Sequence, residues 1–153
     1  MNAPGIGDYM TRTLTIVEPT TKVRHLVELL QKHHIRHLPV LEGTRLVGMV
    51  ADRDVRRALP SVINGATANQ YDEAMDHLTA AQVMTRSPAT IDARATLHEA
   101  VAKMRRLRIA SLPVVEVGAI VGILTESDLL RALEDFTART NVASGEPADL
   151  PRS

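Results

Sequence analysis

The chain contains no cysteine and no tryptophan, and its only aromatic residues are Tyr9, Tyr71 and Phe136. Without cysteine, disulfide bonds, thiolate metal sites and cysteine nucleophiles are excluded. With 2% aromatic residues, few rings are available on which the bases of single-stranded nucleic acid could stack. The 18 basic and 18 acidic residues cancel. We therefore expect neither nucleic acid nor an anionic membrane among the partners.

Long apolar runs are also absent. No stretch of the sequence approaches the roughly 20 apolar residues that cross a bilayer as a helix. Residues 1–9 lack the basic and apolar regions of a signal peptide. We therefore expect a cytoplasmic protein. The 44% of hydrophobic residues are almost entirely aliphatic, and they are enough to form a core.

An internal repeat with an offset of 74 residues organises the chain. Residues 10–59 align without a gap with residues 84–133, and 15 of the 50 aligned positions are identical. About three identities would be expected by chance. Each copy predicts a strand, a helix, two strands joined by a tight turn, and a second helix. The fold class is therefore α/β (α+β), built from two β-α-β-β-α repeats.

The sequence outside the repeats sets the predicted domain boundaries. The predicted segments are a flexible N-terminal arm (1–9), a first repeat (10–60), a linker (61–79), a second repeat (80–138) and a disordered C-terminal tail (139–153). The predicted strands are 14–17, 37–41, 45–50, 90–91, 111–115 and 119–124, and the predicted helices are 23–30, 52–59, 71–78, 97–107 and 126–136.

A glycine and an aspartate recur at matching positions in both copies. Gly48 and Gly122 lie inside apolar strands, where glycine is tolerated when a backbone or a ligand comes close. Asp54 and Asp128 follow these strands, at the start of a helix, where an anionic acceptor is favoured. Two such units in one chain predict a duplicated ligand cradle.

Three short motifs occur in both copies: Met-Thr at the start, Ile-x-x-Leu-Pro-Val at 35–40 and 109–114, and a Val-Gly segment ending in Asp at 47–54 and 121–128. Each copy thereby resembles the CBS domain, named for cystathionine β-synthase, and the tandem pair resembles a Bateman module. The sequence around Arg36 and Asp54 also resembles that of the bacterial acetoin-utilisation-type CBS proteins. The resemblance implies two repeats packed about a pseudo-twofold axis, and a homodimer.

The resemblance also implies an adenosyl ligand, such as AMP, ADP or ATP, in a cleft between the repeats. In this family the aspartate of the motif holds the ribose hydroxyls, and a Thr or Ser three residues earlier faces ribose or phosphate. Asp128, Thr125 and Gly122 match this pattern fully, whereas Asp54 and Gly48 match it without the hydroxyl residue. An ionised carboxylate offers two acceptor oxygens to two neighbouring hydroxyls. The alternative is that both aspartates serve only as acceptors in the first turn of a helix.

A basic pair, Arg36–His37, precedes one Pro-Val strand, and in some nucleotide-binding relatives such a pair grips phosphate. Ile35 and Ile109 are expected in the core and, by resemblance, beside adenine. We therefore expect one principal nucleotide whose ribose meets Asp128 and whose phosphates run toward Arg36 and His37. The alternative for the basic pair is a solvated edge, with Arg36 bound to a nearby acid.

The sequence gives little support for a metal site or for catalysis. His33, His34 and His37 leave their predicted helix too early to converge on a metal, so we expect no metal site. No catalytic motif is found, so we expect no enzyme. The expected function is a regulatory module that needs no cofactor, binds an adenine nucleotide as regulatory ligand and signals to an unknown protein in trans. The alternatives are a ligand-free dimerisation module, a sensor of S-adenosylmethionine or a dinucleotide, and a nucleotide-processing enzyme.

Overall fold

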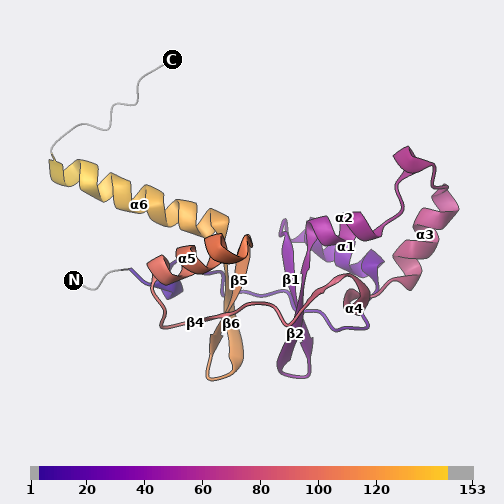
Figure 1. The fold of residues 1–153 in the computed structure, drawn as a ribbon, viewed down its shortest axis with the longest axis horizontal. Coiled ribbons are helices and arrows are strands. Elements are labelled where there is room, and N and C mark those ends of the chain that lie inside the picture. Colours follow the sequence, from indigo (N-terminus) through magenta and orange to yellow (C-terminus); the bar gives the residue numbers. More distant parts are fainter. Residues whose placement is uncertain (1–3, 145–153) are drawn as a thin grey trace, which may run out of the picture.

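Two repeats of the same architecture lie side by side in the computed structural model, which describes residues 4–144 (Figure 1). The first sheet has the strand order β1-β2-β3 and the second the order β4-β5-β6. The elements of the first repeat are η1 (Ile6–Asp8), α1 (Val23–Lys32), β1 (His37–Glu42), β2 (Arg45–Ala51) and α2 (Asp52–Ala58). The elements between the repeats are η2 (Val62–Asn64) and α3 (Ala68–His77). The elements of the second repeat are α4 (Ala80–Val83), β3 (Thr85–Arg86), β4 (Ile91–Asp92), α5 (Leu97–Leu107), β5 (Ser111–Glu116), β6 (Ala119–Thr125) and α6 (Glu126–Ser144).

Each repeat is built around an antiparallel hairpin, β1–β2 in the first and β5–β6 in the second. Both hairpins carry a register irregularity at the same place, after Val40 and after Val114. These two valines point into separate cores and are fully buried. The duplicated α/β fold and its two hairpins, predicted from the 74-residue repeat, are confirmed.

The first residues of each repeat pair with the sheet of the other repeat. Thr85 in β3 pairs with Met49 of the first sheet, and at the matching position Thr11 pairs with Ile123 of the second sheet. Because the start of each repeat completes the sheet of the other, strands β2 and β6 come into contact at the junction between the repeats. This junction holds the clefts described below.

The two strand glycines make room for methionines at these crossings. A Cβ atom on Gly122 would lie 2.7 Å from the Met10 sulfur and 3.0 Å from the Thr11 carbonyl oxygen. A Cβ atom on Gly48 would collide with the sulfur of Met84. The close approach that the sequence predicts at both glycines is therefore made by a methionine side chain.

The prediction of a flexible arm over residues 1–9 is wrong for the part that the structure describes. Ile6 is fully buried in the second core, and the Tyr9 hydroxyl donates to Asp135 at 2.9 Å. The 74-residue offset carries Ile6 onto Ala80, which is also fully buried, so η1 is the counterpart of α4. The repeat thus begins before the first identical residues.

Two further boundaries differ from the prediction. Residues 14–17 form no strand, because only Val17 bridges β1, at Val40. The tail predicted at 139–153 is helical as far as Ser144, since α6 meets no glycine or proline before that residue. The rest of the predicted tail lies outside the described residues.

The linker also contains more structure than predicted. Its helix is α3, which begins at Ala68 rather than at the predicted Tyr71, because Thr67 and Gln70 cap it reciprocally. Met75 of α3 is buried in the first core, and Arg24 on α1 binds Asp76 at 2.6 Å. The linker therefore packs against α1 of the first repeat.

Candidate functional site

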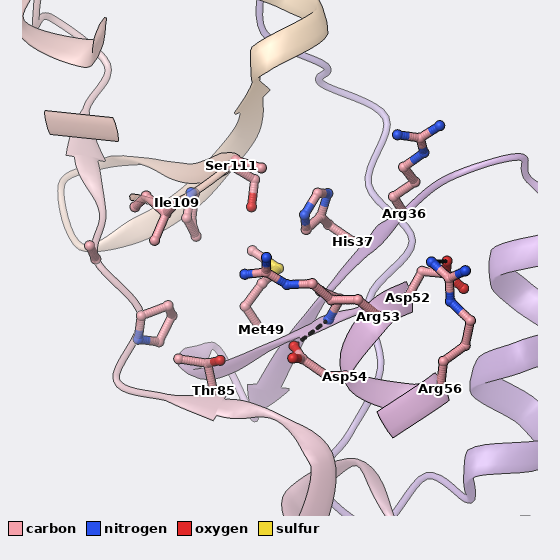
Figure 2. A pocket seen from close by; sticks show the side chains of 15 residues that line it. Arg36, His37, Met49, Asp52, Arg53, Asp54, Arg56, Thr85, Ile109 and Ser111 are labelled. Atoms are coloured by element: carbon pink, nitrogen blue, oxygen red, sulfur yellow. Dashed lines mark hydrogen bonds and ion pairs between the residues drawn. The ribbon is translucent and has the colours of Figure 1, made fainter. Parts of the chain in front are cut away.

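Two clefts lie at the junction of the repeats. Cleft A has a volume of about 550 Å³ and is lined by residues that include Arg36, His37, Arg53, Asp54, Thr85 and Ile109 (Figure 2). Cleft B has a volume of about 350 Å³ and is lined by residues that include Thr11, Ile35, Arg36, His37, Thr125 and Glu126. Both volumes lie within the range usual for small-molecule sites.

The internal repeat relates the two clefts. The offset carries Ile35 of cleft B onto Ile109 of cleft A, and Thr11 onto Thr85. Each cleft combines the hairpin and second helix of one repeat with the isoleucine of the other. The duplicated sequence thus produces two related cavities whose linings differ residue by residue.

In cleft A, the chain turns from β2 into α2 and places Asp54 at the rim. One carboxylate oxygen of Asp54 accepts the Ala51 backbone N–H at 3.2 Å, and this is the only hydrogen bond of that carboxylate within residues 4–144. Its other oxygen is free to accept a hydrogen bond from a ligand. The carboxylate is therefore both a helix cap and an available acceptor.

Arginines dominate the charge of cleft A. The guanidinium groups of Arg36 and Arg53 make no hydrogen bond or ion pair with any residue of the described chain, whereas Arg56 binds Asp52 at 2.7 Å. Two guanidinium groups are therefore available to an anion, and a guanidinium fits phosphate in a bidentate manner.

His37 lies between these arginines and the second repeat. Burial lowers the pKa of His37, and the charge of Arg53 lowers it further. The imidazole is therefore neutral at pH 7 and can donate one hydrogen bond. Figure 2 shows His37, Arg53 and Asp54 facing Thr85 and Ile109 across the opening.

In the second repeat, Asp128 differs from its counterpart Asp54. It is 6% exposed, and one of its carboxylate oxygens accepts from the Thr125 N–H at 2.9 Å and from the Thr125 hydroxyl at 3.0 Å. The other oxygen lies 3.4 Å from Arg131, which donates to the Tyr9 carbonyl at 2.8 Å and lies over the Tyr9 ring. Both oxygens are thus engaged inside the protein, and Asp128 lines neither cleft.

The other candidate residues are distributed between the clefts. Ile109 and Asp54 line cleft A, Ile35 and Thr125 line cleft B, and Arg36 and His37 line both. Gly48 and Gly122 line neither cleft, because they face methionines. The structure thus brings the basic pair together with Asp54, whereas the sequence pairs it with Asp128.

Several lining residues were missed by the sequence analysis. Met49, Thr85 and Ser111 line cleft A, and Thr11 and Glu126 line cleft B. The Met-Thr motif that starts each repeat was the available signal for the two threonines. Its role appears only when each start is paired with the sheet of the other repeat.

Neither a metal-binding cluster nor a membrane-spanning helix is found among the described residues. Among residues 4–144, no group of three or more His, Asp or Glu side chains is placed to hold a metal ion. No helix in the same part of the chain has both the length and the apolar character needed to span a bilayer.

The comparisons with known proteins agree with this architecture. Residues 6–61 and 80–135 each match the model of the CBS domain. CBSX1, a chloroplastic CBS domain-containing protein of Arabidopsis thaliana, is 32% identical over 149 residues, which is 83% of this chain and 63% of its own length. The crystal structure of CBSX2, also from Arabidopsis thaliana, in complex with AMP is 30% identical with a TM-score of 0.74, covering 88% of this chain and 99% of that chain.

A structure named for the acetoin utilization protein AcuB of Vibrio cholerae is 24% identical with a TM-score of 0.71, covering 94% of this chain and 98% of that chain. At this identity the likeness shows the fold alone. The chain spans between 29% and 63% of the length of the first curated relatives it matches. Since the family model matches both repeats, which make up most of the sequence, the chain belongs to the CBS domain family as a tandem pair.

Proposed function

We propose that this CBS pair is a regulatory module that binds an adenine nucleotide in cleft A. The observation that carries the proposal is the combination of the available Asp54 oxygen with the unpaired guanidinium groups of Arg36 and Arg53 around one cavity. A carboxylate suits ribose hydroxyls and guanidinium groups suit phosphate. Nucleotides and sugar phosphates both carry these two groups, and the apolar side chain of Ile109 in the same cleft favours the nucleotide, because it offers a surface for the base.

The cleft supplies a place for each part of the nucleotide. The ribose meets Asp54, the phosphate meets Arg53 and Arg36, and the neutral His37 donates to a phosphate oxygen. Adenine lies against Ile109, on the apolar wall contributed by the second repeat. Thr85 adds a hydroxyl at the base of the cleft. A cationic ligand such as S-adenosylmethionine is disfavoured by the two arginines.

The comparisons support an adenosyl ligand. CBSX2, which shares the fold and 30% of the aligned residues, has been crystallised with AMP. In our proposal this chain takes the same class of ligand, and the phosphate preference comes from Arg36 and Arg53. The module has no catalysis of its own, and it acts in the cytoplasm by passing its bound state to a partner protein in trans.

A homodimer is part of the proposal. Leu130, Leu133 and Phe136 on α6 are each more than half exposed, and α6 extends away from the body of the second repeat (Figure 1). Exposed apolar side chains on one helix mark a surface that a partner covers. A second copy of the chain covers this surface in the proposed dimer.

Isothermal titration calorimetry with AMP, ADP, ATP, adenosine and S-adenosylmethionine tests the proposed ligand. We expect AMP to bind the wild type, and Arg53→Ala to weaken AMP about tenfold while leaving adenosine nearly unchanged, since one charge-assisted contact to phosphate is lost. The control is Arg45→Ala, because Arg45 lies at the hairpin turn, where it pairs with Glu42 at 3.7 Å. If no adenosyl compound binds, a ligand-free structural module replaces the proposal.

A further inference from the structure

The second repeat contributes no arginine to cleft B. The 74-residue offset replaces each arginine of cleft A by an uncharged residue: Arg36 by Ala110, Arg53 by Ser127 and Arg56 by Leu130. Every guanidinium that the first repeat contributes to its cleft is therefore missing from the second. The two related cavities differ most in charge.

Cleft B also carries an uncompensated carboxylate. Glu126 lines cleft B at the position that Asp52 takes in cleft A. Asp52 is neutralised by Arg56 at 2.7 Å, but Glu126 has Leu130 at the corresponding place and forms no ion pair within residues 4–144. An anionic ligand is repelled there, because a like charge close by raises its free energy.

One cation is common to both cavities. Arg36 lines cleft A and cleft B, and no other arginine or lysine lines cleft B in the described chain. Its guanidinium makes no hydrogen bond or ion pair with the described residues, and its backbone is fixed because its carbonyl accepts the Asp52 N–H at 2.8 Å. The side chain can therefore turn to either cleft, but one guanidinium cannot hold a phosphate in both.

The rest of cleft B suits a smaller polar ligand. Its volume is about 350 Å³, compared with about 550 Å³ for cleft A. Hydroxyl groups line it, contributed by Thr11, Thr13, Thr15, Thr125 and Ser127. Hydroxyls both donate and accept hydrogen bonds, so they match the edges of a nucleoside without requiring charge. Ile35 and Ile123 provide an apolar surface for a base.

We propose, on the basis of the function proposed for cleft A, that cleft B binds an unphosphorylated nucleoside and that Arg36 couples the two sites. A phosphate in cleft A takes the Arg36 guanidinium and leaves Glu126 as the dominant charge of cleft B. A second phosphorylated ligand then binds cleft B more weakly. A nucleoside without phosphate does not compete for Arg36, so both clefts fill together.

The proposed coupling predicts by how much, and in which direction, a ligand in cleft A changes the affinity of cleft B. Loss of one charge-assisted contact weakens binding about tenfold. AMP should therefore bind cleft B about tenfold more weakly when cleft A is filled than when it is empty. Adenosine should bind cleft B equally well in both cases, because a ligand that makes no contact with Arg36 carries no coupling through it.

Methyl NMR on isoleucine-labelled protein reads the two sites separately. Ile109 lines only cleft A and Ile123 lines only cleft B. In the wild type we expect AMP to shift the Ile109 methyl first and the Ile123 methyl only at much higher concentration. Adenosine added to the AMP-saturated protein should shift Ile123 at the same concentration as in the absence of AMP.

Variants test the role of Arg36 directly. The double variant Arg53→Ala/Asp54→Asn removes a cation and an acceptor that belong to cleft A alone. With cleft A empty, Arg36 is free, so AMP should shift Ile123 at about tenfold lower concentration than in the wild type. Adding Arg36→Ala to this double variant should abolish the gain. Glu126→Gln should strengthen AMP at Ile123 without changing adenosine.

The outcomes separate this inference from the function on which it rests. If Ile109 responds to no adenine ligand, the proposed function of cleft A fails and the coupling fails with it. If Ile109 responds but AMP shifts Ile123 equally in the wild type and in the double variant, the coupling is overturned while cleft A stands. If adenosine never shifts Ile123, the nucleoside site is overturned.

Discussion

Replacement of Ile6 by alanine tests whether the N-terminal segment belongs to the fold. Ile6 is fully buried in the second core. The substitution removes three carbon atoms, and at about 0.8 kcal/mol each their transfer free energy amounts to about 2.4 kcal/mol. The cavity left behind adds to this, so we expect a loss of about 3 to 4 kcal/mol in the free energy of unfolding.

A matched control uses the same substitution at the surface. Ile63 is 96% exposed, so Ile63→Ala should change the free energy of unfolding by no more than about 0.5 kcal/mol. Urea denaturation followed by circular dichroism measures both variants against the wild type. If Ile6→Ala costs no more than Ile63→Ala, the segment is a loose arm and our description of the repeat is refuted.

Three further predictions concern the glycine crossing, His37 and α6. Gly122→Ala should lower the free energy of unfolding by about 1–3 kcal/mol, because the added methyl meets the Met10 sulfur and a backbone oxygen that cannot withdraw. Met10→Ala destabilises the core by itself, but the further loss caused by Gly122→Ala should be smaller in that background than in the wild type, and equal losses in urea denaturation would contradict the packing argument. His37 has a lowered pKa and is neutral at pH 7, and a bound phosphate favours its protonated form, so protons should be taken up on binding as the pH falls below the ordinary pKa of histidine. From pH 7.5 to 5.5, calorimetry should therefore show AMP affinity falling less in the wild type than in His37→Gln, and parallel profiles would exclude this role. Leu133→Glu should lower the mass measured by light scattering to that of one chain, because it places a charge on the exposed apolar surface of α6; a wild type that is already monomeric would contradict the proposed dimer.

Much of the fold could be predicted because the repeat doubled every local signal. The hairpins and the helix at 97–107 occur where the apolar pattern predicted them. The start of the repeat was missed because residues 5–9 share no identity with residues 79–83, although both segments fill the same position. What the two segments share is a small or apolar residue, Ile6 or Ala80, that must be buried. Alignment by identity does not detect such a requirement.

The candidate site could be predicted only in part. The sequence placed a carboxylate at the start of each helix, and the structure agrees. It does not tell whether that carboxylate turns to the cleft or to its own helix, because the decision depends on which neighbouring side chains reach it. Thr125 and Arg131 engage the two oxygens of Asp128, and the distant Tyr9 carbonyl in turn accepts from Arg131. The unoccupied Asp54 oxygen corresponds to the Asp128 oxygen that Arg131 engages, and Arg57, the counterpart of Arg131, forms no ion pair within residues 4–144.

Calorimetric titration of AMP into Asp54→Asn and Asp128→Asn tests the central claim most directly. Both substitutions keep the shape and remove the charge, and circular dichroism establishes that each variant is folded. Because only Asp54 lines a cleft, its substitution should weaken AMP by about tenfold or more, whereas Asp128→Asn should change the affinity by less than about threefold. A larger loss at Asp128 than at Asp54 would contradict the assignment of the nucleotide to cleft A.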